Sequence, residues 1–322
     1  MTSVVIAGGG PAGASAAIAA CGEGARVIVY EPSRLPRHKV CGEFLSAEIV
    51  PVLDRLGVLP AFRAAGPAAV RRMEFTFGAR RKTAALPETA WGLSRFCLDH
   101  LLLKRTGECG AEVIRERAPA AVDVVAHGRR TAEARGSRLF GFKAHFRGPA
   151  TDAVELFFFG RCYVGLNQIE GGLTNVCGLA PEGELGRFGF AIDDLLASHE
   201  PLRERIAPLG RIMAWLTTGP LVFANGLAGA PGYYCGDALS FVDPFTGSGV
   251  LAACATGVLA GAAAARRIPP EDHIGNCRGT LGRAFGVSSV CRTLVANGWA
   301  ERLVGFVPGA WLYRMTRPQI RA

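Results

Sequence analysis

The sequence predicts an α/β fold in which a parallel β-sheet domain, built from separate stretches of the chain, carries an inserted antiparallel β-sheet. Two units predict the parallel part: a strand, glycine turn, helix and strand at the N-terminus, and a strand, turn and helix near residue 240. Between them, strand-like runs separated by glycine pairs and proline are typical of an antiparallel meander. Apolar residues make up 49% of the 322 residues, which is enough for a sizeable core.

The N-terminal unit has the order of a βαβ motif. Residues 3–8 form an apolar strand, a glycine turn at residues 8–13 leads into an alanine-rich helix, and residues 26–30 form a second strand. Glu31 follows that second strand, where an acidic residue accepts hydrogen bonds from ribose hydroxyls in dinucleotide sites. The unit therefore predicts a Rossmann-type nucleotide-binding domain.

The glycine turn itself matches the GxGxxG pattern. Gly8 permits the tight turn, Gly10 lets a pyrophosphate approach the backbone, and Gly13 lets the helix pack close to the strand. The helix start at Pro11 and Ala12 offers unpaired N–H groups to the phosphates. Together these residues predict a pyrophosphate site.

The second unit indicates which dinucleotide is bound. Within residues 232–251 a strand ends at Asp237, and a turn at Pro244 opens a helix at Gly247 and Gly249. Asp237 is placed to accept hydrogen bonds from ribityl hydroxyls, and a helix N-terminus stabilises negative charge on a reduced flavin. FAD is therefore favoured over NAD.

Three segments carry a resemblance to a known family. They are Glu31 with Pro36-Arg-His-Lys-Val-Cys-Gly-Glu43, Ser94-Arg95 with Leu98-Asp99 and Leu102, and Gly236-Asp237 with Asp243-Pro-Phe-Thr-Gly-Ser-Gly249. Together they resemble the geranylgeranyl reductase group, within the para-hydroxybenzoate hydroxylase superfamily of flavoproteins, over roughly residues 1–265. The resemblance implies FAD, a discontinuous Rossmann domain and a substrate sheet over the flavin ring. No motif demands a covalent flavin bond, so the FAD is expected to be non-covalent.

The resemblance also assigns roles to residues of the first two segments. It implies that Arg37 and Arg95 lie along the FAD pyrophosphate and ribityl chain, with Cys41 and Gly42 near the isoalloxazine ring. Cys41 is the candidate catalytic residue, because a tuned cysteine can position a substrate or donate a proton, and Arg37 and Lys39 can lower its pKa. The alternative is that Cys41 is a small buried apolar side chain.

Other conspicuous residues have ordinary interpretations. His38, His127 and His145 are isolated histidines, for which surface or core roles are expected. Residues 157–159 are three phenylalanines in a strand, where alternate rings face opposite sides, and a plain sheet core is favoured over a pocket floor.

The predicted domain boundaries follow from these units. Residues 1–70, 91–135 and 225–270 form the FAD-binding domain, residues 71–90 and 136–224 the substrate domain, and residues 271–322 a C-terminal helical segment. Expected strands of the substrate sheet include residues 73–77, 139–146, 154–166 and 174–179, and helices are expected at residues 46–57, 96–108 and 188–206.

The chain departs from the family pattern in several places. The hairpin that normally precedes the strand and glycine turn at residues 123–130 is missing, and the tail after residue 265 is short. The tryptophan-centred motif of halogenases and their active-site lysine segment are not found, which disfavours halogenation.

Composition limits the classes of partner and the cellular location that the sequence allows. The net charge of +9 comes from scattered arginines without a basic tail, which argues against nucleic acid. Ten cysteines without a CxxC pair indicate free thiols in the reducing cytoplasm and no metal site, and no signal peptide is expected. Residues 247–265 carry no charge but are mostly small, so a buried helix is favoured over a membrane span. Trp299, Trp311 and Tyr313 indicate a packed C-terminal helix or, less favoured, peripheral membrane contact.

These observations predict an FAD-dependent oxidoreductase that acts on an apolar or aromatic small molecule. Reduction of a C=C bond is favoured over monooxygenation, and NAD(P)H or a reductase partner is the expected electron donor. A non-catalytic flavin-binding or electron-transfer protein is a further alternative. An NAD-dependent dehydrogenase is disfavoured, because neither a catalytic base constellation nor a second nucleotide fingerprint is found.

Overall fold

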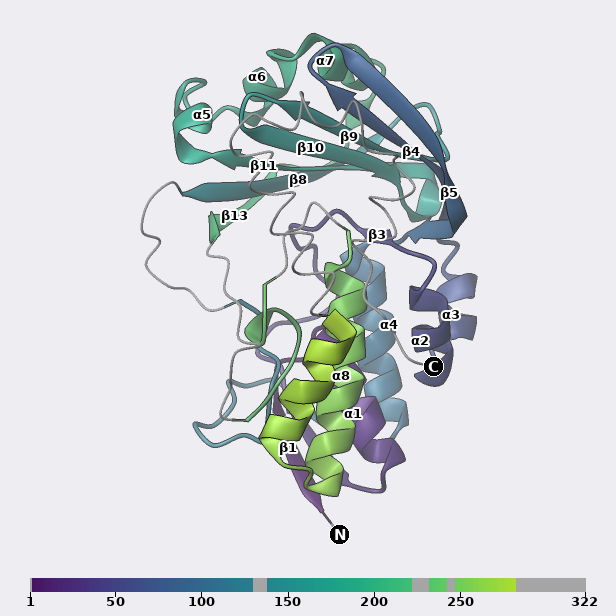
Figure 1. Cartoon of the computed structure of the whole chain (residues 1–322), viewed down its shortest axis with the longest axis vertical. Coiled ribbons are helices and arrows are strands. Elements are labelled where there is room, and N and C mark those ends of the chain that lie inside the picture. The colour runs from purple at the N-terminus through teal and green to yellow at the C-terminus, as the bar shows by residue number, and fades with distance from the viewer. Residues whose placement is uncertain (1, 130–137, 222–231, 242–246, 282–322) are drawn as a thin grey trace.

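The computed structural model describes residues 2–129, 138–221, 232–241 and 247–281. Two layered parts stack on one another, with a bundle of helices and a parallel sheet below and a large curved sheet above (Figure 1). The predicted α/β class is confirmed, with one parallel sheet and one mixed sheet.

The parallel sheet has five strands, here called sheet A. In spatial order they are β14 (Tyr233–Tyr234), β7 (Val124–Val125), β1 (Ser3–Ala7), β2 (Arg26–Tyr30) and β6 (Glu112–Ile114). Every neighbouring pair is parallel. The strand order is that of a Rossmann-type sheet, with β1 at its centre. As expected, residues 115–123 form no hairpin between β6 and β7.

Three helices pack beside this sheet, namely α1 (Pro11–Gly22), α4 (Arg95–Glu108) and α8 (Gly249–Arg266) (Figure 1). The small residues of α8 let it approach α1 closely. A Cβ on Gly257 would lie 2.2 Å from the Ala12 carbonyl oxygen, and one on Gly261 would lie 2.0 Å from that of Ala16. Among the described helices, α8 alone is long and apolar enough to cross a membrane, and 61% of it is buried. Its composition therefore serves contact with α1.

The larger sheet, sheet B, has nine strands. They are β3 (Phe44–Leu45), β4 (Ala68–Phe77), β5 (Arg80–Gly92), β8 (Leu139–Arg147), β9 (Ala153–Phe159), β10 (Cys162–Gln168), β11 (Leu173–Pro181), β12 (Gly210–Arg211) and β13 (Leu216–Leu221). The pairs are antiparallel except β4 with β9, which is parallel, so the sheet predicted as antiparallel contains one parallel pair.

Two further element predictions are corrected. The single strand expected at residues 154–166 is a hairpin, because Gly160 takes a positive φ of 53° and turns the chain between β9 and β10. The long helix expected at residues 188–206 is instead α6 (Ile192–Ala197) and α7 (Glu200–Ile206), after a short α5 (Glu182–Gly186). The extended backbone of His199, the N-cap residue of α7, separates α6 from α7.

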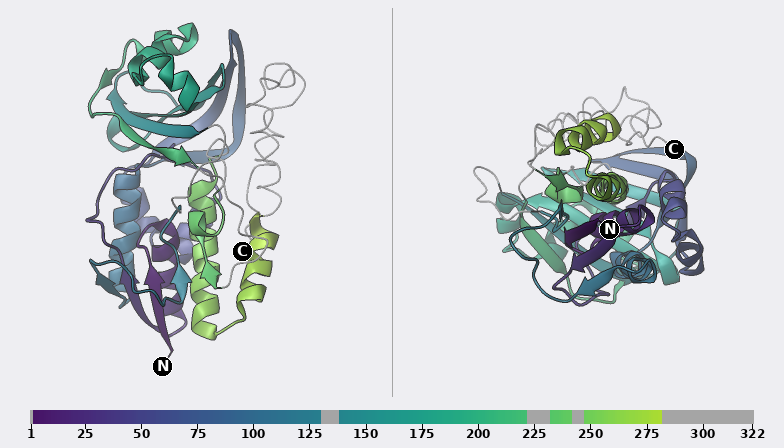
Figure 2. Two further views of the ribbon diagram at one scale, coloured as in Figure 1. Left: turned by 90° about the vertical axis from the view of Figure 1, so that its left-hand side faces the viewer. Right: turned by 90° about the horizontal axis from the view of Figure 1, so that it is seen from below.

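The remaining predicted helices are shorter or only partly described. The helix expected at residues 46–57 is α2 (Ile49–Arg55), followed by α3 (Leu59–Ala64). Residues 270–281 are helical and run beside α8 (Figure 2). Trp299, Trp311 and Tyr313 lie outside the described residues.

The two faces of sheet B have different surroundings. On β8, Phe142 and Phe146 belong to the apolar core shared with α6 and α7. The alternate residues Lys143 and His145 point to the opposite face, where they contact Glu43 of the lower part. One face thus forms a core, and the other faces the Rossmann-type domain.

Candidate functional site

A cavity of about 740 Å³ lies between the carboxyl ends of the sheet A strands and sheet B. All of the predicted binding residues except Gly13 and Pro244 line it: Gly8, Gly10, Pro11, Ala12, Glu31, Arg37, Cys41, Gly42, Arg95, Asp237, Gly247 and Gly249. Gly13 lies in the first turn of α1 and packs against Gly8 instead of facing the cavity. Pro244 lies outside the described residues. Ligands of open parallel sheets bind at this end of the strands.

The glycine turn has the geometry that its sequence pattern predicts. Gly8 has a φ of 105°, and a Cβ there would lie 2.4 Å from the Ala126 carbonyl oxygen. A Cβ on Gly13 would lie 1.7 Å from the Gly8 carbonyl oxygen, so Gly13 serves the close packing of α1. A Cβ on Gly10 would lie 3.7 Å from the Lys39 ammonium nitrogen, the nearest atom outside the turn, so space is open over this part of the backbone.

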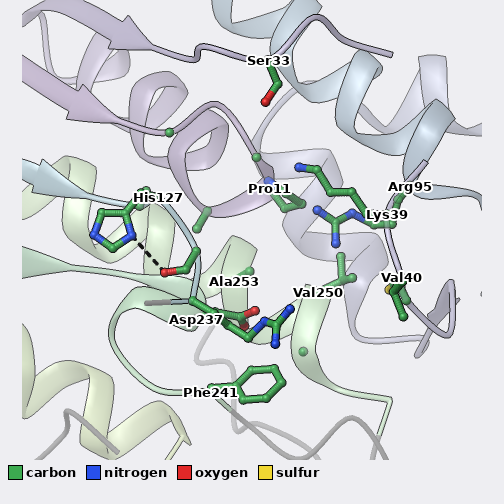
Figure 3. A pocket seen from close by; sticks show the side chains of 18 of the residues that line it. Pro11, Ser33, Lys39, Val40, Arg95, His127, Asp237, Phe241, Val250 and Ala253 are labelled. Carbon is green, nitrogen blue, oxygen red and sulfur yellow. Dashed lines mark hydrogen bonds between the residues drawn. The ribbon is translucent and has the colours of Figure 1, made fainter. Parts of the chain in front are cut away.

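The first turn of α1 opens into the cavity. It carries no acidic residue, and its N-cap Gly10 supplies no side-chain hydrogen bond. Pro11, Lys39 and Arg95 lie close together at this end (Figure 3). A helix N-terminus beside cationic side chains fits an anionic group such as a pyrophosphate.

Glu31 stands at the edge of the cavity after β2. Its carboxylate accepts hydrogen bonds from the amides of Gly9 and Ser33, both at 2.9 Å. Burial by itself would raise the pKa of Glu31, but these hydrogen bonds and the Lys39 charge lower it overall. The carboxylate stays ionised, and each oxygen has a further lone pair for a ribose hydroxyl.

Arg95 belongs to a buried ion cluster. Its guanidinium donates two hydrogen bonds to the fully buried Asp99, at 2.6 and 2.9 Å, and Lys39 donates a third at 2.9 Å. Burial would raise the pKa of Asp99, but Arg95 and then Lys39 hold it below its usual value. This cluster fixes two cations beside the first turn of α1.

Asp237 lies in the cavity wall within the short helix η3 (Gly236–Ala238), as Figure 3 shows. Burial raises the pKa of its carboxyl, against the opposing charges of Arg95, Arg129 and Lys39. Within the described residues its side chain accepts no hydrogen bond. An acceptor without a donor, facing a cavity, fits a polyhydroxy chain such as ribityl. The residues present therefore fit FAD.

The Cys41–Gly42 turn forms the part of the wall beneath sheet B. Asn175 on β11 donates hydrogen bonds to the carbonyl oxygens of Cys41 and Gly42, at 3.1 and 2.9 Å. The Cys41 thiol accepts a hydrogen bond from the Glu43 amide at 3.4 Å. Cys177 of sheet B also lines this wall.

A buried charged cluster behind this turn was not predicted from the sequence. Glu43, Lys143 and His145 are all buried, and the Glu43 carboxylate accepts hydrogen bonds from Lys143 and from His145, the latter at 2.7 Å. His145 takes a buried and hydrogen-bonded position, in agreement with the expected core role, but it is not isolated, because Glu43 lies beside it. The available signal was the placement of Lys143 and His145 among alternating apolar residues of a strand.

The other predicted residues take varied positions. His38 is exposed and its ring stacks on Phe96, whereas His127 lines the cavity. Residues 157–159 do not line the cavity: Phe157 lies in the core and Phe158 stacks on Phe77.

Comparison with known proteins identifies the N-terminal part. Residues 1–133 match the family model described as FAD binding domain. The chain carries an FAD-binding domain. The predicted cofactor FAD is thereby supported by both sequence and geometry.

Two curated proteins match short stretches of this chain. The menaquinone reductase of Mycolicibacterium smegmatis is 44% identical over 55 residues, which is 17% of this chain and 13% of that protein. The tryptophan 2-halogenase of Chondromyces crocatus is 34% identical over 98 residues, which is 30% of this chain and 16% of that protein. The matches thus span less than a fifth of each curated relative.

Solved structures match nearly the whole chain. A flavoprotein/dehydrogenase from Cytophaga hutchinsonii has a TM-score of 0.81 and 16% identity, covering 97% of this chain and 91% of that chain. A geranylgeranyl bacteriochlorophyll reductase-like protein from Thermoplasma acidophilum has a TM-score of 0.70 and 17% identity, covering 98% and 90%. A flavin-dependent brominase has a TM-score of 0.74 and 18% identity, covering 94% and 90%. The predicted resemblance is confirmed in fold.

Proposed function

We propose that the protein is an FAD-dependent oxidoreductase that reduces an apolar or aromatic small molecule, in the manner of the geranylgeranyl reductase group. The observation that carries this proposal is a single cavity that joins the nucleotide-binding turn of sheet A to an apolar wall under sheet B. That wall includes Val40, Tyr163, Leu179 and Leu221. When bound, FAD supplies the two-electron chemistry, and the chain binds and orients both reactants.

Different residues along the cavity would hold different parts of FAD. The first turn of α1 with Arg37 and Lys39 would hold the pyrophosphate, Glu31 the adenosine ribose, and Asp237 the ribityl chain. The helix N–H groups and the two cations suit the anionic pyrophosphate. The two carboxylates suit the hydroxyl groups of the ribose and the ribityl chain. The apolar wall would exclude water from the reacting end.

The Cys41–Gly42 turn would border the flavin ring and the substrate together. We expect Cys41→Ser to keep FAD affinity and to change turnover or substrate choice, because the hydroxyl is smaller and less acidic than the thiol. Wild-type kinetics with every substrate tested would assign Cys41 an inert role.

Two observations support reduction as the reaction. The two motif segments around Cys41 and Asp237 resemble those of the reductase group, and a curated menaquinone reductase matches part of the chain at 44% identity. An FAD-dependent monooxygenase is the second candidate, because the same fold is shared with a flavin-dependent brominase. A non-catalytic flavin protein is the third.

The experiment begins with the absorbance spectrum of the purified protein. A flavin spectrum, with the colour released by acid precipitation, supports non-covalent FAD, and a colourless protein that takes up no added FAD refutes the proposal. Chemically reduced enzyme is then mixed without oxygen with polyprenyl, quinone or polyketide-like substrates. Saturated or reduced product supports reductase activity. Product that forms only with oxygen, and contains one of its atoms, establishes the monooxygenase instead.

Three further parts of the proposal concern the electron donor, the location and membrane contact. NAD(P)H or a reductase partner would supply the electrons, which anaerobic mixing with each donor tests. A cytoplasmic location fits the nine cysteines described, all of which are free. Peripheral membrane contact through the C-terminal segment is tested by vesicle co-sedimentation.

A further inference from the structure

One cation of the cavity lies apart from those expected to hold the pyrophosphate. Arg129 comes shortly after β7, lines the cavity and is half-buried. Its guanidinium donates a hydrogen bond of 2.7 Å to the Thr218 hydroxyl on β13, and it lies over the Phe241 ring, 5.1 Å from the ring centroid. The guanidinium is thereby held between the Rossmann-type domain and sheet B.

The contact with Thr218 places this charge at the apolar wall of the cavity. Gly141 on β8 shows how the wall is packed, because a Cβ there would lie between 3.1 and 3.2 Å from side-chain carbons of Thr218, Leu179 and Val40. Leu179 and Val40 are part of the apolar wall, and Thr218 lines the same cavity. The guanidinium therefore stands beside the surface expected to receive the apolar body of a substrate.

The described residues do not compensate fully for the burial of Arg129. Burial lowers the pKa of its guanidinium, against the attraction of Asp237. Arginine keeps its charge in proteins even so. Within the part of the chain that the structure describes, the guanidinium donates to Thr218 alone, so most of its N–H groups have no acceptor there. A partly buried cation with unused donors that faces a cavity favours an anionic ligand.

The surroundings of Arg129 favour a ligand with a single negative charge. Figure 3 shows Phe241 below Asp237 and away from Lys39 at the start of α1. A diphosphate is better served at the Lys39 end, by the helix N-terminus there. Beside Arg129, the Asp237 carboxyl would repel a second negative charge. The planar guanidinium fork instead matches a carboxylate, with which it forms two parallel hydrogen bonds.

We propose that Arg129 binds the carboxylate of a substrate whose remaining surface is apolar and packs against the wall that includes Val40 and Leu179. This proposal rests on the proposed function, since it names an acidic group on the apolar or aromatic molecule to be reduced. A carboxylate held at Arg129 also fixes the orientation of the apolar body in the cavity. Arg129 is thus assigned the selection of acids over neutral molecules of the same shape.

The first test compares acids with their amides. Calorimetric titration of the FAD-bound protein uses 2-naphthoate and decanoate, each paired with its primary amide, which keeps the apolar body and removes the charge. A hydrogen bond to a charged group changes Kd roughly 10- to 150-fold, so the wild type should bind an acid more tightly than its amide by about that factor. Arg129→Gln should abolish this preference and leave the amide Kd unchanged. A wild type that binds neither acid more tightly than its amide would overturn the proposal.

Two variants control for charge in general. Arg211 also carries its guanidinium over an aromatic ring, that of Trp215 at 5.5 Å, but it does not line the cavity. Arg211→Gln therefore removes the same charge and should keep the acid preference. Arg129→Lys keeps the charge without the planar fork and should retain only part of the preference. Equal losses in Arg211→Gln and Arg129→Gln would assign the preference to net charge and overturn the proposal.

A second substitution keeps the test informative if Arg129→Gln fails to fold. Thr218→Val leaves the guanidinium in place and removes the hydroxyl that accepts its hydrogen bond. The acid preference should fall in this variant, because the fork is no longer held at the wall. A folded Thr218→Val protein with the wild-type preference would contradict the placement of Arg129 and overturn the proposal.

The negative charge of a reduced flavin is the other anion that could meet Arg129. The midpoint potential of bound FAD separates the two sources. An unchanged potential with a lost acid preference in Arg129→Gln supports the substrate carboxylate, whereas a lowered potential with the preference intact assigns Arg129 to the cofactor and overturns the proposal. Failure of the proposed function is distinguishable, because a protein that takes up no FAD refutes that function, and the acid preference is then measured on the FAD-free protein.

Discussion

Replacement of Asp237 by asparagine separates cofactor binding from protein stability. The side chain keeps its size, but it loses the negative charge that faces the cavity without a described hydrogen-bond donor. A hydrogen bond to a charged group contributes about 1.5–3 kcal/mol, so the Kd for FAD should rise roughly 10- to 150-fold. Fluorescence titration of the FAD-free protein measures this change.

The same substitution should not weaken the FAD-free protein. The pKa of Asp237 is raised by burial, so its folded-state value lies above the unfolded one. Such a carboxyl costs stability as pH rises through the raised pKa, and Asp237→Asn removes that cost. Thermal melts should therefore show an equal or higher Tm at neutral pH. Glu108→Gln, on the exposed end of α4, is the control for charge removal. An unchanged Kd with a lowered Tm would refute the reasoning.

Three further substitutions test separate parts of the structure. Asp99→Asn removes the buried partner of Arg95 and should lower the free energy of unfolding, measured in urea, by about 3–5 kcal/mol. Because the pKa of Asp99 is lowered in the folded protein, the stability of the wild type should fall as the pH drops through that lowered value. Glu31→Ala should weaken FAD binding by about 1.5–3 kcal/mol in the same titration, and an unaltered Kd would remove Glu31 from the site. Gly261→Ala should lower the Tm, since its Cβ would lie 2.0 Å from the Ala16 carbonyl oxygen, whereas Gly275→Ala, with open space around it, should not.

The parts of the site that are local in sequence could be predicted. The glycine turn, Glu31 and the strand before Asp237 each combine a backbone requirement with a side chain a few residues away. The strand-to-hairpin correction at Gly160 shows the limit of this approach, because an apolar run does not reveal where a buried chain turns.

The parts that depend on pairing between distant strands could not be predicted. The parallel contact of β4 with β9 joins strands that lie far apart in the chain, and no local pattern encodes it. Likewise, the partner of His145 is Glu43, 102 residues earlier in the chain. Each of these residues looks ordinary alone, and only the stacking of sheet B on the Rossmann-type domain brings them together.

The late completion of sheet A has a consequence for synthesis of the protein. β14 joins the sheet beside β7, and α8 covers α1, only after all of sheet B has been made. An emerging nascent chain therefore exposes the small-residue face of α1 and an unpaired edge at β7 until translation passes α8. Such high contact order slows folding and leaves aggregation-prone intermediates, so this protein should depend on chaperones during translation more than one whose nucleotide-binding domain is continuous.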